Sequence, residues 1–193
     1  MESIDQGLAD ATALTDWLRR AEREDRAVSV LAERLATCLK GGHRILACGN
    51  GGSMSDAMHF AEELSGRFRD QRPALAAQAL SDPGHLTCVA NDVGFEHVFS
   101  RGVEAFGRAG DALVVFTTSG KSPNVVAAAR AARAAGLVVV GLLGRDGGPV
   151  LPLCDASIVV PGKTPDRIQE VHIKIVHLLI GEIERALFAG RDR

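Results

Sequence analysis

Tyrosine is absent from the sequence, and aromatic residues make up only 4% of its 193 positions. Surfaces that bind single-stranded nucleic acid stack the bases on aromatic side chains, which this composition supplies in small number. The charge points the same way, because 22 basic and 24 acidic residues are mixed along the chain and give a net charge of −2. Without a basic stripe, the sequence does not predict a nucleic-acid partner.

Cysteine pairs and long apolar runs are also lacking. The four cysteines, at positions 38, 48, 88 and 154, form no CxxC motif, so neither a disulfide framework nor a thiolate zinc site is predicted. The N-terminal segment has no apolar signal core, and no apolar run reaches the ~18 residues that a bilayer span requires. We therefore expect a cytoplasmic protein without a membrane partner.

What the sequence does contain is enough apolar material for a core. Hydrophobic residues make up 46% of the chain, and its length suits a single domain over residues 1–193. Apolar residues recur every three to four positions from Leu8 to Leu18 and from Val28 to Leu39, and two glycines follow at 41 and 42. This pattern predicts an N-terminal helical extension over residues 1–40.

Beyond residue 42, short apolar runs alternate with helical segments. Strands with apolar residues on both faces, separated by helices, predict an α/β fold with a parallel sheet covered on both sides. Ligands bind such sheets beyond the carboxyl ends of the strands. We expect strands at 44–48, 111–119, 137–144 and 156–161, a shorter one within 73–80, and helices from the loop after residue 48 to about 68, at 122–135 and at 165–188.

The first loop of interest is GNGGS, residues 49–53. A dinucleotide-binding fingerprint needs a third glycine where Met54 stands, so that interpretation fails. The glycines still allow a sharp turn and a close approach to a ligand. We expect Ser53 or Ser55 to cap the following helix, whose free N–H groups favour an anion. A plain glycine turn before a helix remains the alternative.

The second loop is FTTSGKSPN, residues 116–124. A P-loop needs a glycine five residues before Gly120, where Val115 stands, so ATP binding by this loop is excluded. Hydroxyl groups clustered at a helix N-terminus can hold a phosphate without that motif. The alternative is an ordinary turn capped by Ser122, with Pro123 in the first helical position.

A histidine and a glutamate share one helix face, because His59 and Glu63 are four residues apart. In the last helix, Gln169 and His177 are eight residues apart and project within roughly 80° of each other. That helix is apolar nearly all round and is therefore expected to be buried. Imidazole, carboxylate and amide groups together can bind zinc. A plain helix pair and a satisfied core histidine remain the alternative.

The order of these motifs resembles that of the phosphoheptose isomerases, a family of the sugar isomerase (SIS) domain superfamily. The matching segments are GNGGS, His59, Glu63, SDPGHL, AND at 90–92, FTTSGKS, DGG at 146–148 and DRIQEVHIKIVH. GNGGS alone is a weak signal, but the whole set at this spacing is highly specific and covers nearly the whole chain.

The resemblance implies a three-layer sandwich with a five-stranded parallel sheet of the flavodoxin-like SIS type. It also implies a homotetramer with active sites at subunit interfaces. One Zn²⁺ per subunit would be held by His59, Glu63, Gln169 and His177. The implied substrate contacts are Asn50, Gly51, Gly52, Ser53, Glu63, Asn91, Asp92, Thr117, Thr118, Ser119, Ser122, Asp166 and Gln169.

The implied reaction is an aldose–ketose isomerisation in heptose biosynthesis. It would convert sedoheptulose 7-phosphate to D-glycero-D-manno-heptose 7-phosphate through an enediol, which requires a base and an acid. We assign Glu63 as the base and His177 as the acid. Two alternatives are a non-catalytic SIS protein that binds the DnaA replication initiator, and an isomerase or sensor for another sugar phosphate.

Overall fold

The computed structural model describes residues 3–188 and confirms a five-stranded parallel sheet. The strand order is β2-β1-β3-β4-β5, which is the flavodoxin-like arrangement. Each expected strand is present within a few residues of its predicted bounds, and the strand within 73–80 is short. The bounds are β1 Ile45–Gly49, β2 Ala77–Ala79, β3 Ala112–Thr117, β4 Val138–Gly144 and β5 Ala156–Val160.

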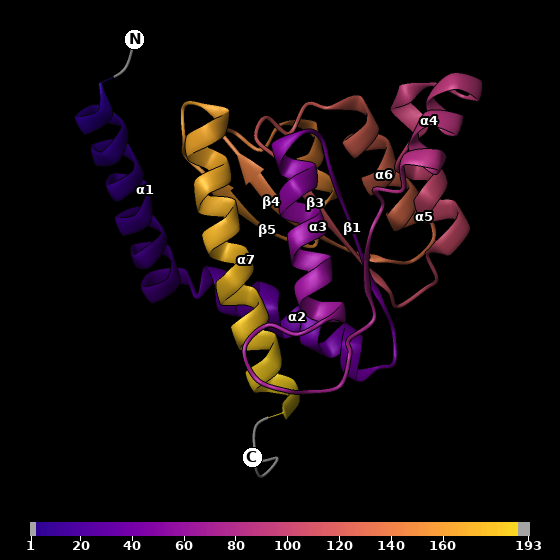
Figure 1. Cartoon of the computed structure of the whole chain (residues 1–193), viewed down its shortest axis with the longest axis horizontal. Coiled ribbons are helices and arrows are strands. Elements are labelled where there is room, and N and C mark those ends of the chain that lie inside the picture. Colours follow the sequence, from indigo (N-terminus) through magenta and orange to yellow (C-terminus); the bar gives the residue numbers. More distant parts are fainter. Residues whose placement is uncertain (1–2, 189–193) are drawn as a thin grey trace.

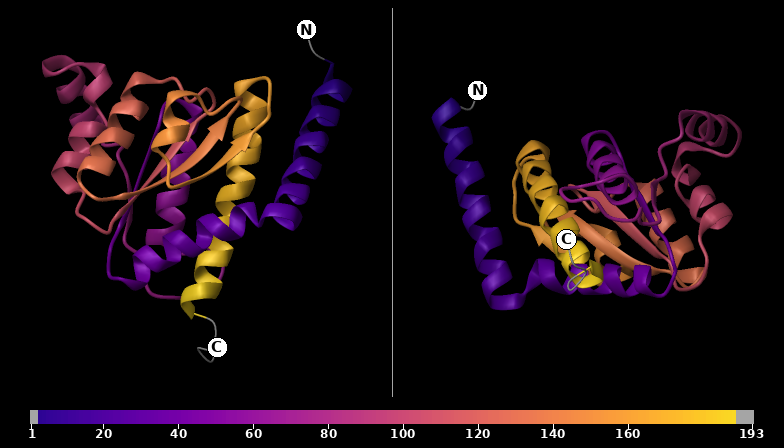
Figure 2. Two further views of the ribbon diagram at one scale, coloured as in Figure 1. Left: turned by 180° about the vertical axis from the view of Figure 1, so that it is seen from behind. Right: turned by 60° about the horizontal axis from the view of Figure 1, so that its bottom comes forward.

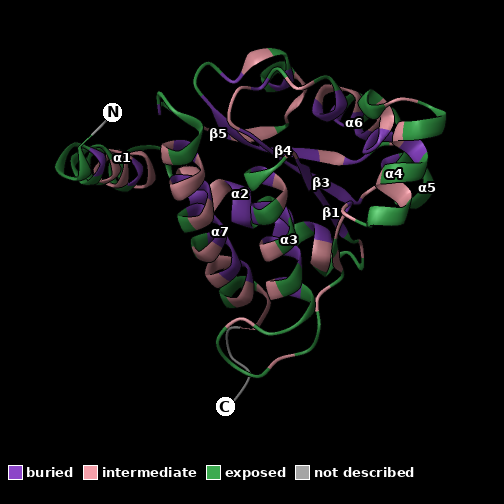
Figure 3. Cartoon of the chain, turned by 45° about the horizontal axis from the view of Figure 1, so that its top comes forward, coloured by how far each residue is buried: buried purple, intermediate pink, exposed green. Residues whose placement is uncertain are grey.

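Helices cover both faces of the sheet and complete three layers (Figure 1). One face is packed against α2 (Ala27–Lys40), α3 (Gly52–Ser65) and α7 (Pro165–Phe188). The other face is packed against α6 (Pro123–Ala134) and α5 (Ser100–Phe106), with α4 (Pro83–Asp92) and the short 3-10 helices η1 (Phe95–His97) and η2 (Gly148–Leu153) beside them. Buried residues follow the sheet between these layers (Figure 3).

Strand β3 explains why both faces are apolar. Its alternate residues Ala112, Val114 and Phe116 enter the core beneath α3 and α7, whereas Leu113 and Val115 enter the core on the α6 side. All six residues of the strand are buried. A strand in the middle of a doubly covered sheet therefore appears in sequence as a continuous apolar run instead of an alternating one.

The predicted helical N-terminal region is present as two helices, α1 (Ile4–Asp25) and α2, over the described part of residues 1–40. They are separated at Arg26, whose φ of 52° lies in the left-handed region. Helix α1 stands out beside α7 (Figure 2), and Ile4 and Leu8 are 83% and 64% exposed. The single-domain prediction extends to residues 1–2 and 189–193, which lie outside the described residues.

The segment between residues 81 and 110 carried no predicted element, yet it forms α4, η1 and α5. A signal for α4 was present, because Asp82 accepts a hydrogen bond from the His85 backbone N–H and Pro83 occupies the first turn. Helix α3 ends at Ser65 instead of about residue 68, since Gly66 follows it. No helix between residues 3 and 188 combines the length and apolar character needed to cross a membrane.

His172 is a packing residue. It is fully buried on α7, and its ring shares a hydrogen bond of 3.2 Å with the carbonyl oxygen of Leu143 at the end of β4. Burial lowers the pKa of His172 from 6.5 to about 4, although the bond to Leu143 opposes this shift. The folded protein therefore keeps this ring neutral at pH values where an unfolded chain would protonate it.

We predict that His172 contributes to the loss of unfolding free energy at acidic pH. Because the pKa is lowered in the folded state, the stabilising effect is complete above about pH 6.5 and is lost as the pH falls toward 4. Between pH 7.5 and 4.5, the wild type should lose about 2 kcal/mol more unfolding free energy than His172→Gln. Urea unfolding at both pH values measures the difference, and equal losses would contradict the assignment.

Candidate active site at the α3–α7 helix pair

Helices α3 and α7 lie side by side on one face of the sheet and run in the same direction (Figure 1). Each begins at the carboxyl edge, α3 directly after the loop that leaves β1 and α7 shortly after β5. Their shared face places Gly52 beside Gln169 near the start of both helices, and His59 beside His177 further along. Residues 118 positions apart in sequence therefore meet within one chain.

The two histidines are in direct contact. Their Nε2 atoms are 3.1 Å apart, so one ring donates a hydrogen bond to the other, and the ring planes meet at 61°. The Glu63 Oε1 atom lies 3.5 Å from the same His59 nitrogen. Phe68 stacks on the other ring, with centroids 5.8 Å apart and an interplanar angle of 23°, which limits the orientation of His177.

These atoms have the spacing of ligands around one metal ion. With bonds of about 2.0–2.2 Å, two ligand atoms on a tetrahedral zinc ion lie about 3.3–3.5 Å apart. The observed separations of 3.1 Å and 3.5 Å are close to that value. A second acidic side chain, Glu62, also offers an oxygen to the group, since ligand atoms of His59, Glu62 and Glu63 all lie within 4.8 Å of one another.

Gln169 occupies a different level of the helix pair. A Cβ atom added at Gly52 would lie 2.6 Å from its Oε1 atom, so its amide rests against the start of α3. The structure therefore joins Gln169 to the GNGGS loop, while His59, Glu63 and His177 meet about two turns further along the helices. A larger residue at position 52 would displace this amide.

The GNGGS loop differs from the prediction in its cap. We expected Ser53 or Ser55 to cap α3, but the N-cap residue is Gly51, which has no side chain to make a capping hydrogen bond. The cause is the positive φ of 56° at Gly51, which starts the helix early and leaves Ser53 buried inside its first turn. The first N–H groups of α3 are consequently not satisfied by a side-chain cap.

The hydroxyl-rich loop begins where β3 ends. The buried Thr117 Oγ1 atom accepts a hydrogen bond of 3.0 Å from the Gly120 N–H and closes the turn. Ser122 is the N-cap residue of α6 and Pro123 follows it in the first turn, as the capped-turn alternative expected, but the Ser122 hydroxyl makes no capping hydrogen bond. The Ser119 hydroxyl accepts from the Lys121 N–H, and Thr118 is half-buried beside it.

The two loops are tied together by a pair of amides. Asn50 and Asn124 exchange two side-chain hydrogen bonds of 2.8 Å each, which link the start of α3 to the first turn of α6. No role for Asn124 was predicted, because an asparagine that follows a proline at the start of a helix carries no distinctive signal. This link fixes both potential phosphate-binding loops at one edge of the sheet.

The remaining predicted contacts lie apart from the histidine pair. Asn91 and Asp92 are exposed in the last turn of α4, where the Asn91 amide donates to the Asp92 carboxylate at 2.6 Å. Asp166 is exposed in the first turn of α7. A hydrogen bond from Thr164 is the main reason why its pKa is lowered, and Arg167 contributes.

Asp56 is a residue near the site that sequence reasoning missed. It is buried on α3 one turn before His59, and its Oδ2 atom has no hydrogen-bond partner among the described residues. Burial raises the pKa of Asp56 to about 6, while the nearby His59 opposes the shift. Its spacing from His59 could have indicated the helix face, but the burial of that face depends on the sheet.

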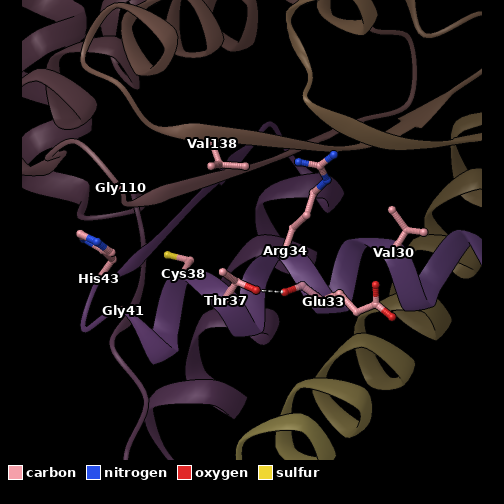
Figure 4. A pocket seen from close by; sticks show the side chains of 9 residues that line it. All are labelled: Val30, Glu33, Arg34, Thr37, Cys38, Gly41, His43, Gly110 and Val138. Atoms are coloured by element: carbon pink, nitrogen blue, oxygen red, sulfur yellow. Dashed lines mark hydrogen bonds between the residues drawn. The ribbon is translucent and has the colours of Figure 1, made fainter.

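A hollow of about 660 Å³ lies elsewhere, at the amino edge of the sheet (Figure 4). Its lining includes Arg34 and Thr37 from α2, His43 before β1 and Gly110 before β3. This edge is opposite to the one that binds ligands in parallel α/β sheets. We therefore place the candidate site at the carboxyl edge, along α3 and α7.

Comparison with known proteins agrees with this geometry. A family model described as SIS domain matches residues 11–144, which defines the class of protein. Among curated proteins, the phosphoheptose isomerase of Fusobacterium nucleatum is 53% identical over 167 residues, with 86% of each chain covered. That of Klebsiella pneumoniae is 52% identical over 181 residues, with 93% of each covered.

Solved structures lead to the same group. The phosphoheptose isomerase of Neisseria gonorrhoeae matches with a TM-score of 0.85 and 41% identity, covering 94% of this chain and 96% of its own. A phosphoheptose isomerase from Francisella tularensis matches with a TM-score of 0.88, 33% identity and the same coverage. The chain therefore belongs to the phosphoheptose isomerase family of SIS domain proteins.

Proposed function

We propose that this protein is an aldose–ketose isomerase that converts sedoheptulose 7-phosphate to D-glycero-D-manno-heptose 7-phosphate in heptose biosynthesis. The observation that carries the proposal is the contact between His59 and His177 at 3.1 Å, with the Glu63 carboxylate 3.5 Å from His59. An acid and a base thus lie together on one helix pair, beside two loops suited to a phosphate. The relatives that match most of the chain are named phosphoheptose isomerase.

The loops at the carboxyl edge would hold the phosphate. The N-termini of α3 and α6 lack side-chain caps, and the hydroxyls of Thr118, Ser119 and Ser122 surround the second. N–H groups and hydroxyls of this kind bind an anion without a permanent cation. Binding energy at the phosphate end would then orient the reacting carbons for proton transfer.

Glu63 and His177 would move the protons. In an aldose–ketose isomerisation, a base removes the proton from the carbon beside the carbonyl, and an acid protonates the carbonyl oxygen to give the enediol. We assign the Glu63 carboxylate as the base and His177 as the acid. The stacked Phe68 ring would keep His177 in one orientation during both half-reactions.

We also propose a zinc site formed by His59, Glu63, Gln169 and His177, of which Gln169 lies on α7 about two turns before His177. The ligand spacing and the mixed imidazole–carboxylate chemistry of these residues support it. A bound divalent ion would polarise the carbonyl and stabilise negative charge on its oxygen. A carboxylate that binds metal is a weaker base, so Glu63 would serve the proton transfer best when the ion mainly positions the sugar.

Assembly as a homotetramer and a cytoplasmic location complete the proposal. Large apolar side chains are exposed on three helices: Ile4 and Leu8 on α1, Met58 on α3 and Leu178 on α7. Subunit contacts in a tetramer would remove this apolar surface from water. The four cysteines are all free, which suits a reducing compartment.

Removal of either proton-transfer group should abolish most activity. We expect Glu63→Gln and His177→Ala to lower kcat for sedoheptulose 7-phosphate by at least about 100-fold, because acid–base catalysis contributes factors of about 10²–10⁴. The product is identified by NMR. His97→Ala is the matched control, since His97 lies on η1 and pairs with Glu96. A folded Glu63 or His177 variant with near wild-type turnover would refute the roles.

Metal removal tests the zinc proposal separately. Purified protein should contain about one zinc ion per chain, and treatment with a chelator should remove both the zinc and most of the activity. Addition of Zn²⁺ should restore both, as measured by elemental analysis and by turnover. A protein that lacks stoichiometric zinc and is indifferent to chelators would exclude this site.

The tetramer predicts a mass in solution of four times the 20.4 kDa of the chain. Size-exclusion chromatography with light scattering measures it directly. Replacement of the exposed Leu8 by Glu should shift the mass to smaller species, because a charge would be buried in the contact. A wild-type monomer at micromolar concentration would contradict the proposed assembly.

A further inference from the structure

Arg72 lies in the connection that follows α3 and makes an unusual set of contacts there. One terminal nitrogen donates to the Glu63 carbonyl at 2.6 Å, and the other donates to the Leu64 carbonyl at 2.7 Å and the Gly66 carbonyl at 3.1 Å. Its Nε atom donates to the Glu184 carboxylate of α7 at 2.7 Å. A single guanidinium therefore joins the end of α3 to α7.

The position suits a buried cation. The last carbonyl groups of a helix have no partner within it and carry a partial negative charge, so a cation at this end is favourable. The Arg72 side chain is only 5% exposed and that of Glu184 15%, and each neutralises the other. The planar guanidinium donates to several carbonyls at the end of α3 at once, including that of Leu64, which also accepts from the Leu75 N–H at 3.1 Å. A lysine ammonium cannot reproduce this planar arrangement of donors.

The contact forms a second connection between the two helices that carry the site. Glu184 is seven residues after His177, so both project from nearly the same face of α7 at levels about 10 Å apart. On α3, the carbonyl held by Arg72 belongs to Glu63, whose carboxylate lies 3.5 Å from His59. The backbone of the proposed base is thus fixed relative to the helix of the proposed acid.

We propose that Arg72 is a positioning residue for the His59–Glu63–His177 group. It does not contact substrate, because its side chain is enclosed by backbone carbonyls and Glu184. Its effect is exerted through the Glu63 main chain, which it holds in register with α7. This inference rests on the proposed isomerase function, since it assigns the Arg72 guanidinium a role in the geometry of the proton transfer.

The expected effect of Arg72 on kcat and KM follows from its distance from the loops proposed to bind phosphate. The loops proposed to bind phosphate lie at the carboxyl edge of the sheet. The Arg72 guanidinium lies at the opposite end of α3, beyond the two histidines. Weakening the hydrogen bonds of Arg72 should therefore disturb the proton-transfer groups and leave phosphate binding nearly intact. Small misplacements of reacting groups reduce rates strongly, whereas binding of a remote phosphate depends on other contacts.

The test is Arg72→Lys in the full-length protein, assayed with sedoheptulose 7-phosphate. Lysine keeps the charge opposite Glu184 but loses the planar guanidinium. We expect kcat to fall at least tenfold with KM within twofold of wild type. Amide hydrogen exchange across residues 60–66 should increase at the same time, which reports directly on the loosened end of α3.

Asp111→Asn is the matched control for a loss of stability. Asp111 is buried and accepts hydrogen bonds from the Arg44 and Arg108 N–H groups at 2.9 Å and 3.0 Å, beside the His43 and Gly110 of Figure 4. It is thus a buried charged link at the opposite edge of the sheet. Its replacement should lower the melting temperature but leave kcat within twofold of wild type.

Glu184→Gln covers the case in which the lysine variant does not fold. It keeps the bonds to α3 but weakens the link to α7, so kcat should fall at least threefold with KM unchanged. If a folded Arg72→Lys, or Glu184→Gln in its place, retains wild-type kcat, the inference is wrong. A kcat loss of equal size in Asp111→Asn would also overturn it. A wild type without turnover would instead refute the proposed function on which the inference depends.

Discussion

The site depends on the parallel packing of α3 against α7. Both helices start at the carboxyl edge and run together across one face of the sheet, so side chains from distant parts of the chain meet at successive levels. Gln169 meets Gly52 first, His177 then meets His59, and Glu184 is joined through Arg72 to the end of α3. A change in the register of these helices would separate all three levels at once.

The loops at the carboxyl edge depend on backbone contacts that only glycine permits. Gly120 has a φ of +64°, and a Cβ atom there would lie 1.9 Å from the Gly147 carbonyl oxygen. The hydroxyl loop is therefore seated directly on the loop after β4, with no side chain between them. The DGG segment at 146–148 thus has a structural reason: it allows this approach.

Much of the fold could be predicted because the apolar pattern has one consistent interpretation. The buried runs of β1, β3 and β4 and the long α7 appear within a few residues of their expected bounds. The helices between residues 81 and 110 were missed, since α4 has only 10 residues and α5 only 7, and so short a segment shows little helical periodicity. The cap of α3 was predicted wrongly, because a glycine with positive φ depends on the surrounding loop, and Ser122 is the N-cap residue of α6 without the expected capping hydrogen bond.

The sequence by itself determined the parallel α/β class, the two candidate loops and the pairing of His59 with Glu63, because these follow from periodicity and local spacing. Only the tertiary structure decided that His177 lies 3.1 Å from His59 and that Phe68 stacks on it. It also decided which arginine of the segment after α3 becomes buried against Glu184. Such contacts depend on how two helices lie on a sheet, and sequence separation carries no information about that distance.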